Sequence, residues 1–175
     1  MKYYLGWDLS TSCSAYALLD DKGNLVEFDS IDFKNKKKFP DIFSKAKKIK
    51  EKMIYLCSQY DRIENVFIEE PLKRFQYHKS SAQTIAILWR FNGFISEICS
   101  AICGFPPENI SVGTARKVCK ISIPKKTNAK PVVLKHIQNT ESLFKPTLTK
   151  FGNVKTHFYD IADAIVIAKA GFKMS

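Results

Sequence analysis

The first third of the chain alternates between short apolar runs and turn-forming residues. Apolar runs occupy residues 2–8, 15–19 and 25–31, and the turn formers DDKGN at 20–24 separate the last two. Short apolar runs joined by tight turns are typical of strands that pair with their neighbours along the chain. The pattern therefore predicts an antiparallel meander of three strands, in which residues 2–8 form a buried first strand.

Beyond this meander, helical spacing of apolar residues alternates with short apolar runs. The pattern predicts helices over 39–60, 80–102, 114–120, 130–139 and 160–173, and strands over 66–68 and 109–112. Strands separated by helices are joined by crossover connections, which favour parallel pairing. We therefore expect a single α/β domain over residues 1–175. Its mixed central sheet, antiparallel in the first three strands and parallel afterwards, is flanked by helices.

The helix expected over 80–102 is apolar on more than one of its faces. An N-cap is available at Ser80 or Ser81, just before the apolar residues begin. A single core-facing stripe does not require so many apolar positions. Two explanations stay open from the residues alone: the additional face is a dimer interface, or the helix is completely buried in the monomer.

The composition is that of a folded protein with reduced cysteines. Of the 175 residues, 45% are hydrophobic, and no apolar run approaches the ~18 residues of a membrane span. The first residues, MKYYLGWD, do not form the apolar stretch of a signal peptide. We therefore expect no membrane partner and a cytoplasmic location in a bacterium or a phage-infected host, with a viral factory, an organelle or a eukaryotic nucleus as alternatives. The 5 cysteines are odd in number and widely spaced, which favours buried thiols over disulfides or zinc ligands.

The chain is strongly basic, with a net charge of +11. A polyanionic partner fits this balance, and nucleic acid is the first candidate. Residues 109–140 contain no acid, and the turn formers in SIPKKTNAKP predict an exposed loop there that contacts phosphates. The basic side chains of this stretch that we expect to contact nucleic acid are Arg116, Lys117, Lys120, Lys125, Lys126 and Lys130. A second basic block at 34–52 is either a solvated helix face or a further contact surface.

Four acidic residues stand where carboxylates are costly to bury. Asp8 and Glu69 each end an apolar strand, and strand ends in α/β sheets are where ligands bind. Asp160 and Asp163 share one face of the closing helix, where Asp163 interrupts the apolar run IADAIVIA. Glu70 competes with Glu69, because alternation sends the two side chains to opposite faces of the strand. We choose Glu69, which directly follows the apolar run.

Convergence of these carboxylates would produce a dense negative site. Carboxylates without counterions repel one another and raise one another's pKa values. One or two Mg²⁺ ions relieve the repulsion, because hard cations take oxygen ligands. Two ions about 4 Å apart activate water and stabilise the leaving oxygen in phosphodiester cleavage. An acidic centre in a basic protein therefore predicts a metal-dependent nuclease, although the helix dipole alone would also favour an acid at Asp160.

The motifs GWDLSTS, VFIEE and YDIADAIVIA, in this order, resemble the RuvC family of Holliday junction resolvases within the RNase H-like superfamily. The resemblance covers nearly the whole chain, and its most specific part is the D-x-x-D-A motif that begins at Asp160. Leu9 and Ser10 stand where the bacterial enzymes usually have Pro-Gly. In this respect the chain resembles phage, viral or distant members of the family. The resemblance implies an RNase H-like fold.

The activity implied by the resemblance is that of a crossover junction endodeoxyribonuclease, which resolves four-way DNA junctions by paired nicks with metal-activated water. The catalytic residues and metal ligands would be Asp8, Glu69, Asp160 and Asp163. The cofactor would be Mg²⁺, or Mn²⁺, as two ions per active site. The family acts as a homodimer through the helix that here spans 80–102, which favours the dimer explanation for its apolar faces.

The resemblance also implies DNA contacts outside the metal ligands. Lys130 resembles the family's lysine near the scissile phosphate, and Lys120 resembles a second basic position. In this family an aromatic residue in the loop after the glutamate wedges into the junction; Phe75 is the candidate here, and Tyr77 is its competitor. The basic residues around Phe75 that would hold an opened DNA branch are Lys73, Arg74 and Lys79.

Three other functions match parts of the pattern. The same fold and metals would serve a nuclease that acts on RNA, an RNA–DNA hybrid or another branched DNA. A non-catalytic DNA-binding relative would not need all four carboxylates. An ATP-binding actin-like or sugar-kinase-like domain begins with a similar strand, but it needs two lobes and Gly-rich phosphate loops, which we do not find here. His157, three residues before Asp160, either assists at the metal or is structural.

Overall fold

The computed structural model describes residues 1–71 and 81–175, and its strands form one sheet with the order β3-β2-β1-β4-β5. The strands are β1 (Lys2–Asp8), β2 (Cys13–Leu19), β3 (Leu25–Asp32), β4 (Arg62–Glu69) and β5 (Glu108–Ile110). The helices are α1 (Ile42–Gln59), α2 (Ala82–Cys103), α3 (Val112–Val118), α4 (Ala129–Thr140) and α5 (His157–Met174). Strand β2 pairs antiparallel with β1 and β3, whereas β4 pairs parallel with β1 and β5. The predicted mixed sheet and its antiparallel meander are confirmed.

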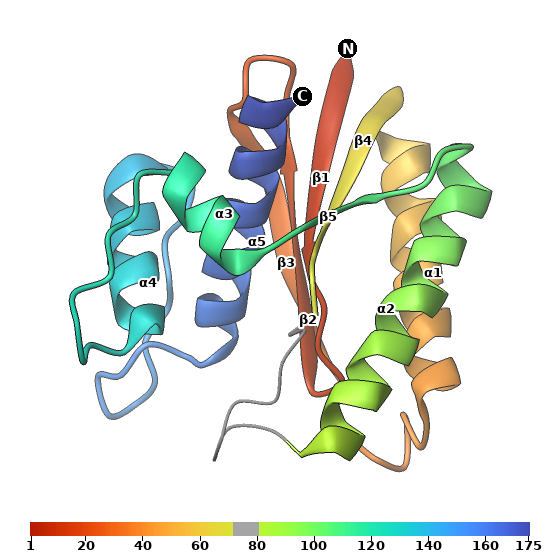
Figure 1. The fold of residues 1–175 in the computed structure, drawn as a ribbon, viewed down its shortest axis with the longest axis horizontal. Helices are drawn as coiled ribbons and strands as arrows, with labels where there is room; N and C mark the ends of the chain where they lie inside the picture. Colours follow the sequence, from red (N-terminus) through yellow and green to blue (C-terminus); the bar gives the residue numbers. More distant parts are fainter. Residues whose placement is uncertain (72–80) are drawn as a thin grey trace.

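Two layers of helices enclose the sheet. Figure 1 shows α1 and α2 on one face and α3, α4 and α5 on the other. Each layer packs on its own cluster of buried side chains: Trp7 and Ile49 belong to the α1–α2 cluster, and Phe67 and Ile165 belong to the α5 cluster. This is the α/β architecture that the alternation of strands and helices predicts.

Helix α5 lies very close to the middle of the sheet, because glycines line the contact from both sides. A Cβ atom on Gly6 of β1 would lie 2.5 Å from the backbone nitrogen of Ala168. A Cβ atom on Gly171 of α5 would lie 2.2 Å from the Phe67 ring. Neither gap has room for a methyl group in a close-packed interior. The two glycines therefore allow α5 to lie directly on β1 and β4.

The direction of the strand-end carboxylates follows from the alternation of side chains along β1 and β4. Trp7 and Ile68 are opposite each other in this parallel pair, and both are buried in the α1–α2 cluster. The next residue on a strand points to the other face. Asp8 and Glu69 therefore point to the face of the sheet that α5 covers.

Every predicted strand except the first differs in extent from the sequence prediction: β2 begins at Cys13 rather than at residue 15, and β3 ends at Asp32 rather than at residue 31. The strand predicted at 109–112 ends at Ile110, because Ser111 caps helix α3 by accepting a hydrogen bond from the Thr114 backbone NH (3.1 Å). Strand β4 begins at Arg62 rather than at residue 66, because its first residues pair with the start of β1. Propensity alone did not show this pairing, which depends on a partner strand far away in the sequence.

Each predicted helix begins at another residue than expected: α2 begins at Ala82, α3 at Val112 and α4 at Ala129, rather than at residues 80, 114 and 130. Helix α1 begins at Ile42 rather than at residue 39, because the Asp41 side chain caps it and accepts a hydrogen bond from the Ser44 backbone NH (2.8 Å). Helix α5 begins at His157, one turn before the predicted start at Asp160. Asp160 therefore lies in the first turn of α5, where the helix dipole favours a negative charge.

Helix α2 is only partly buried, so complete burial in the monomer is the wrong explanation for its apolar character. Its cap is Ser81, which accepts a hydrogen bond from the Thr84 backbone NH (3.1 Å). The side chain of Trp89 is 42% exposed. By length and hydropathy α2 also qualifies as a membrane-spanning candidate, contrary to the expectation that no apolar run is long enough. The continuous-run criterion missed it because Arg90 and Glu97 interrupt the apolar residues.

Candidate active site

Three elements bring the four predicted carboxylates to one edge of the sheet. Asp8 ends β1, Glu69 ends β4, and the other two lie in the first turns of α5. The side chains of Asp8 and Glu69 interact electrostatically with each other. Asp8 also lies within electrostatic reach of Asp160 and Asp163. The fold therefore assembles one acidic cluster from the beginning, the middle and the end of the chain.

Burial and mutual repulsion raise the pKa values in this cluster. Burial raises the pKa of Asp8 well above its ordinary value, and the charges of the three other carboxylates raise it further. Burial, and then the charge of Asp163, raise the pKa of Glu69 to about 7. Burial likewise raises the pKa of Asp163. The Asp8–Glu69 pair therefore retains a proton near neutral pH unless cations compensate its charge.

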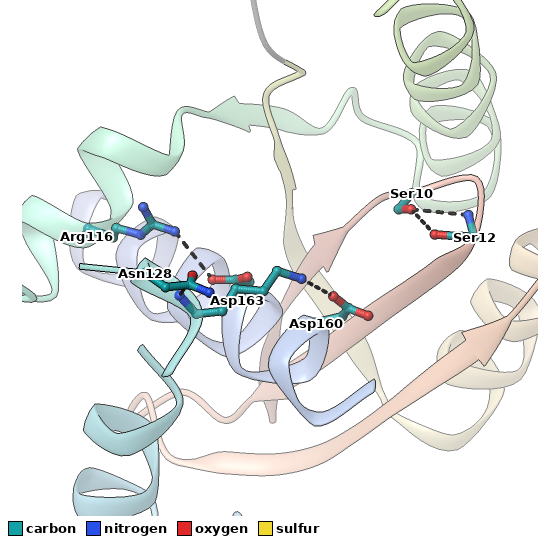
Figure 2. A network of polar contacts seen from close by, with 7 residues as sticks. Ser10, Ser12, Arg116, Asn128, Asp160 and Asp163 are labelled. Atoms are coloured by element: carbon teal, nitrogen blue, oxygen red, sulfur yellow. Dashed lines mark hydrogen bonds and ion pairs between the residues drawn. The ribbon is translucent and has the colours of Figure 1, made fainter. Parts of the chain in front are cut away.

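Two basic side chains from neighbouring helices partly neutralise the carboxylates of α5. Lys130 Nζ donates a hydrogen bond to Asp160 Oδ1 at 2.7 Å, and Arg116 Nη2 lies 3.8 Å from Asp163 Oδ1. Figure 2 shows both contacts as dashed lines beside α5. Partial burial lowers the pKa of Lys130, but the hydrogen bond to Asp160 and the neighbouring acidic charges raise it above its ordinary value overall. Lys130 is therefore a cation at any physiological pH.

The position of Lys130 depends on the start of helix α4. The Asn128 side chain accepts a hydrogen bond from the Lys130 backbone NH (3.1 Å) and so caps the helix after the basic loop. Because α4 packs along α5, this cap places the lysine beside the first turn of α5.

The Ser/Thr residues after Asp8 close the turn between β1 and β2. The Ser10 backbone NH donates to Ser14 Oγ (3.1 Å), and Ser14 Oγ donates in turn to the Ser10 carbonyl oxygen (2.9 Å). The hydroxyls of Ser10 and Ser12 lie 3.0 Å apart, as Figure 2 shows. These hydrogen bonds stabilise the turn. The turn follows directly after Asp8, so they also help to fix the end of β1.

A cavity of about 490 Å³ opens beside Asp160. Lys34 and His157 line it from the end of β3 and the start of α5. Cys13 lines it from β2; burial and then the charge of Asp160 raise the pKa of this thiol to about 12, so the thiol stays protonated. Sequence reasoning did not place Lys34 or Cys13 at the site. No local signal marks them, because only the pairing of β2 with β3 brings them there.

The donor chemistry of the acidic cluster fits a hard divalent cation such as Mg²⁺. All four side chains offer carboxylate oxygens. Burial raises the pKa values of Asp8, Glu69 and Asp163, and the negative charge of neighbouring carboxylates raises them further; a bound cation would offset that charge. Across residues 1–71 and 81–175, no three His, Cys, Asp or Glu side chains are grouped so as to hold an ion in this arrangement. Lys130 donates a hydrogen bond to Asp160 Oδ1, and Arg116 lies 3.8 Å from Asp163 Oδ1, so a cation at these two oxygens would have to displace both basic side chains.

Several residues predicted to contact DNA lie on the surface. Lys125 and Lys126 are exposed in the loop before α4, which confirms the predicted exposed loop, and Lys117 is exposed on α3. Their contacts with DNA stay predictions. The remaining predicted contacts belong to the segment after β4, which lies outside the described residues. They are Lys73, Arg74, Phe75 and Lys79, with Tyr77 as the alternative to Phe75.

Lys120 does not lie with the carboxylates. It lines a second cavity, which Lys169 and Lys173 also line near the C-terminal end of α5, whereas Asp160 lies in the first turn of that helix. Arg116, four residues earlier, is the side chain that approaches the acidic cluster. Helix α3 is short and ends before Lys120, so the two residues point to different parts of the surface.

Several lysines of the basic block at 34–52 have partners within the protein. Lys45 Nζ donates to the Thr11 carbonyl oxygen at 2.7 Å, and Lys48 Nζ pairs with Glu51 at 2.8 Å. Lys52 Nζ lies 5.3 Å from the centre of the Tyr16 ring. These contacts favour the interpretation of α1 as a solvated and structurally supported face.

The fold is that of the RuvC resolvases. The chain superposes on Thermus thermophilus RuvC in complex with a Holliday junction substrate with a TM-score of 0.68 and 13% identity, over 98% of this chain and 94% of that one. A second Thermus thermophilus RuvC structure gives 0.64 and 13%, over 97% and 93%. The yeast mitochondrial Holliday junction resolvase Ydc2 gives 0.61 and 15%, over 97% of this chain and 77% of that chain. No protein-family model and no curated protein matches the sequence. The expected RNase H-like architecture is thereby confirmed.

Proposed function

We propose that this chain is a metal-dependent, structure-selective endodeoxyribonuclease that resolves four-way DNA junctions by paired nicks. The observation that supports this most strongly is the convergence of the four carboxylates at one edge of the sheet, from β1, β4 and α5. The chain shares its fold with RuvC and Ydc2, which are named as acting on Holliday junctions. A net charge of +11 supports a polyanionic substrate.

Each residue of the site has a role in this proposal. Asp8, Glu69, Asp160 and Asp163 would hold one or two Mg²⁺ ions, or Mn²⁺. When bound, the ions would supply positive charge at the phosphate and a means to activate water. Lys130 and Arg116, released from the α5 carboxylates, would donate to phosphate oxygens of the DNA strand. His157, on the wall of the neighbouring cavity, would orient the water or the phosphate by a hydrogen bond.

Paired nicks require two active sites, and we propose a homodimer in which α2 forms the interface. Trp89 on α2 is 42% exposed. A Cβ atom added to Gly93, one turn further along, would meet nothing within 4 Å, so a second backbone has room to approach there. Association of two copies would bury apolar surface that the single chain leaves in water.

The test is cleavage of a labelled synthetic four-way DNA junction in Mg²⁺ and in EDTA, beside a linear duplex and an RNA–DNA hybrid. Asp8→Asn removes one proposed ligand with almost no change in size. Asp21→Asn, in the exposed turn between β2 and β3, is the matched control. We expect symmetric nicks on the junction with Mg²⁺, none with EDTA or Asp8→Asn, and wild-type cleavage with Asp21→Asn.

Two other results would overturn the proposal in different ways. If only the RNA–DNA hybrid were cleaved, the proposed metal site would stand, but the substrate would be RNA rather than a DNA junction. Tight junction binding without cleavage, unaffected by Asp8→Asn, would leave a non-catalytic DNA-binding protein.

A further inference from the structure

The segment that joins α4 to α5 forms a tight β-hairpin over residues 147–155, which we call the 147–155 hairpin. Leu148 and Val154 form an antiparallel bridge, and the Thr149 backbone NH donates to the Asn153 carbonyl oxygen at 2.7 Å. At the tip, the Gly152 NH donates to the Thr149 carbonyl oxygen at 3.0 Å. Gly152 has a φ of 79°, as a three-residue hairpin loop with a glycine bulge requires. The backbone at the tip is therefore well defined by its own hydrogen bonds.

An aromatic side chain stands at this tip with most of its surface in water. Phe151 is 78% exposed, the largest exposed fraction of any large hydrophobic side chain among residues 1–71 and 81–175. Leu148, on the arm of the hairpin, is 56% exposed. Neither side chain belongs to the buried core, and together they present apolar surface to the solvent on one hairpin.

The charged residues on either side of Phe151 along the chain are all basic. No acid occurs between Glu141 and Asp160, and the stretch contains the exposed lysines Lys145, Lys150 and Lys155. The Nζ atom of Lys150 lies 4.9 Å from the centre of the Phe151 ring. An exposed aromatic ring among lysines is the combination that binds a nucleic-acid strand, because the ring stacks on a base while the lysines neutralise phosphates.

The hairpin is attached firmly to the side of the molecule that contains the acidic cluster. At its base, buried Phe144 packs edge-on against Phe28 of β3 and Phe158 of α5, with ring centres 5.5 Å and 5.9 Å apart. Its second arm leads directly into α5, where Thr156 and His157 line the same cavity as Asp160. Figure 1 shows the α4–α5 connection at the end of the molecule where α5 begins.

From these observations we infer that the 147–155 hairpin is a second DNA-binding element, in which Phe151 stacks on an unpaired or opened base next to the cleaved strand. Lys150 and Lys155 contact the phosphates on either side of that base. This inference rests on the proposed function, because it takes branched DNA as the ligand. It assigns a base contact to residues that the sequence motifs did not mark.

The experiment is a double-mutant cycle between protein and DNA. It removes the Phe151 ring and the stacked base separately and then together. Binding would be measured in the Asp8→Asn background to a series of four-way junctions with one abasic nucleotide at successive positions around the crossover. We expect Phe151→Ala to weaken binding to the intact junction about tenfold, in the range for loss of one stacked base. At the position that Phe151 contacts, removal of the base should weaken binding of the parent protein by a similar factor. Removal of the same base should leave the affinity of Phe151→Ala unchanged.

Matched variants separate stacking from charge and from general loss of apolar surface. Phe151→Trp should retain the affinity. Lys150→Ala should lower the slope of log affinity against log salt by about one, whereas Phe151→Ala should leave that slope unchanged. Met174→Ala removes another exposed apolar side chain, at the opposite end of α5, and should have no effect.

Failure of the inference is distinguishable from failure of the proposed function. Normal junction binding and cleavage by Phe151→Ala, or additive losses at every abasic position, would overturn the hairpin contact alone. If Phe151→Ala changed the sedimentation coefficient instead, the hairpin would contact a second copy of the chain, and the inference would also be wrong. A protein that neither binds nor cuts junctions would refute the proposed function, and with it the ligand assumed here.

Discussion

Lys130 Nζ lies 2.7 Å from Asp160 Oδ1, so a cation from α4 occupies an oxygen of one of the proposed metal ligands. The pair joins the end of the basic loop to the first turn of α5. In the proposed reaction this lysine has to exchange its carboxylate partner for a phosphate of the DNA. Substitution of Lys130 should therefore have two opposite effects, one on the cleavage rate and one on the affinity for Mg²⁺.

Lys130→Met should lower the rate of junction cleavage and raise the affinity for Mg²⁺. Loss of the charge at the phosphate should slow single-turnover cleavage by about 100-fold, as for loss of one preorganised donor. Removal of a cation from an acidic cluster should lower the Mg²⁺ concentration needed for half-maximal thermal stabilisation. Lys125→Met, in the exposed loop, is the control and should change neither value appreciably. Unchanged cleavage by Lys130→Met would remove the lysine from the mechanism.

The stability of the metal-free protein should fall as the pH rises from about 4.5 to about 7. The pKa of Glu69 is about 7 in the folded protein, above its ordinary value of 4.5. The folded state therefore binds more protons than the unfolded state between these values, and this group destabilises the fold progressively as the pH rises from about 4.5 to about 7. Below that window the group contributes nothing, and above it the full cost is present.

Glu69→Gln tests this assignment directly. In EDTA the variant should be more stable than the parent by ~1–3 kcal/mol at pH 8, and the difference should vanish at pH 4.5. Thermal unfolding of both proteins across this range is the measurement. Mg²⁺ should stabilise the parent more at pH 8 than at pH 6, because the carboxylates must lose their protons to bind it. A difference between the two proteins that does not depend on pH would contradict the raised pKa.

Gly6→Ala should destabilise the protein and misplace the site together. The added methyl group would lie 2.5 Å from the backbone nitrogen of Ala168, so α5 has to move away from β1. We expect a loss of about 2–3 kcal/mol of unfolding free energy, as for overpacking of a core. Gly113→Ala, in helix α3 with nothing near its added methyl group, should instead be neutral or slightly stabilising. Denaturant unfolding would show whether the two alanines have opposite effects.

Trp89→Arg should convert the proposed dimer to a monomer without unfolding it. The side chain is 42% exposed, so the charge remains in water in the single chain but would be buried at an α2 interface. Sedimentation velocity should show one smaller species, and paired nicks should become single, slow ones. Leu143→Arg, at a 50% exposed position on the other side of the sheet, is the control and should leave the dimer intact. A parent protein that sediments as a monomer would contradict the dimer outright.

The sequence by itself determined the order of the elements and the identity of the acidic residues. Alternation of short apolar runs with helical spacing identified the meander and the later crossover units, because side-chain periodicity reports local backbone conformation. An Asp within IADAIVIA and acids at the ends of two apolar strands were visible because buried carboxylates are costly and therefore stand out. Element boundaries set by caps, at Asp41 and Ser111, were predicted less well.

Only the tertiary structure decided which of these residues meet. The pairing of Lys130 with Asp160, the approach of Arg116 to Asp163 and the position of Cys13 beside the site depend on contacts between distant segments. The close approach of α5 to the sheet depends on Gly6 and Gly171, whose role no local pattern reveals. Periodicity specifies which face of an element is buried, but it does not specify which element covers that face. The acidic cluster, its cationic partners and the exposed ring of Phe151 are therefore properties of the fold.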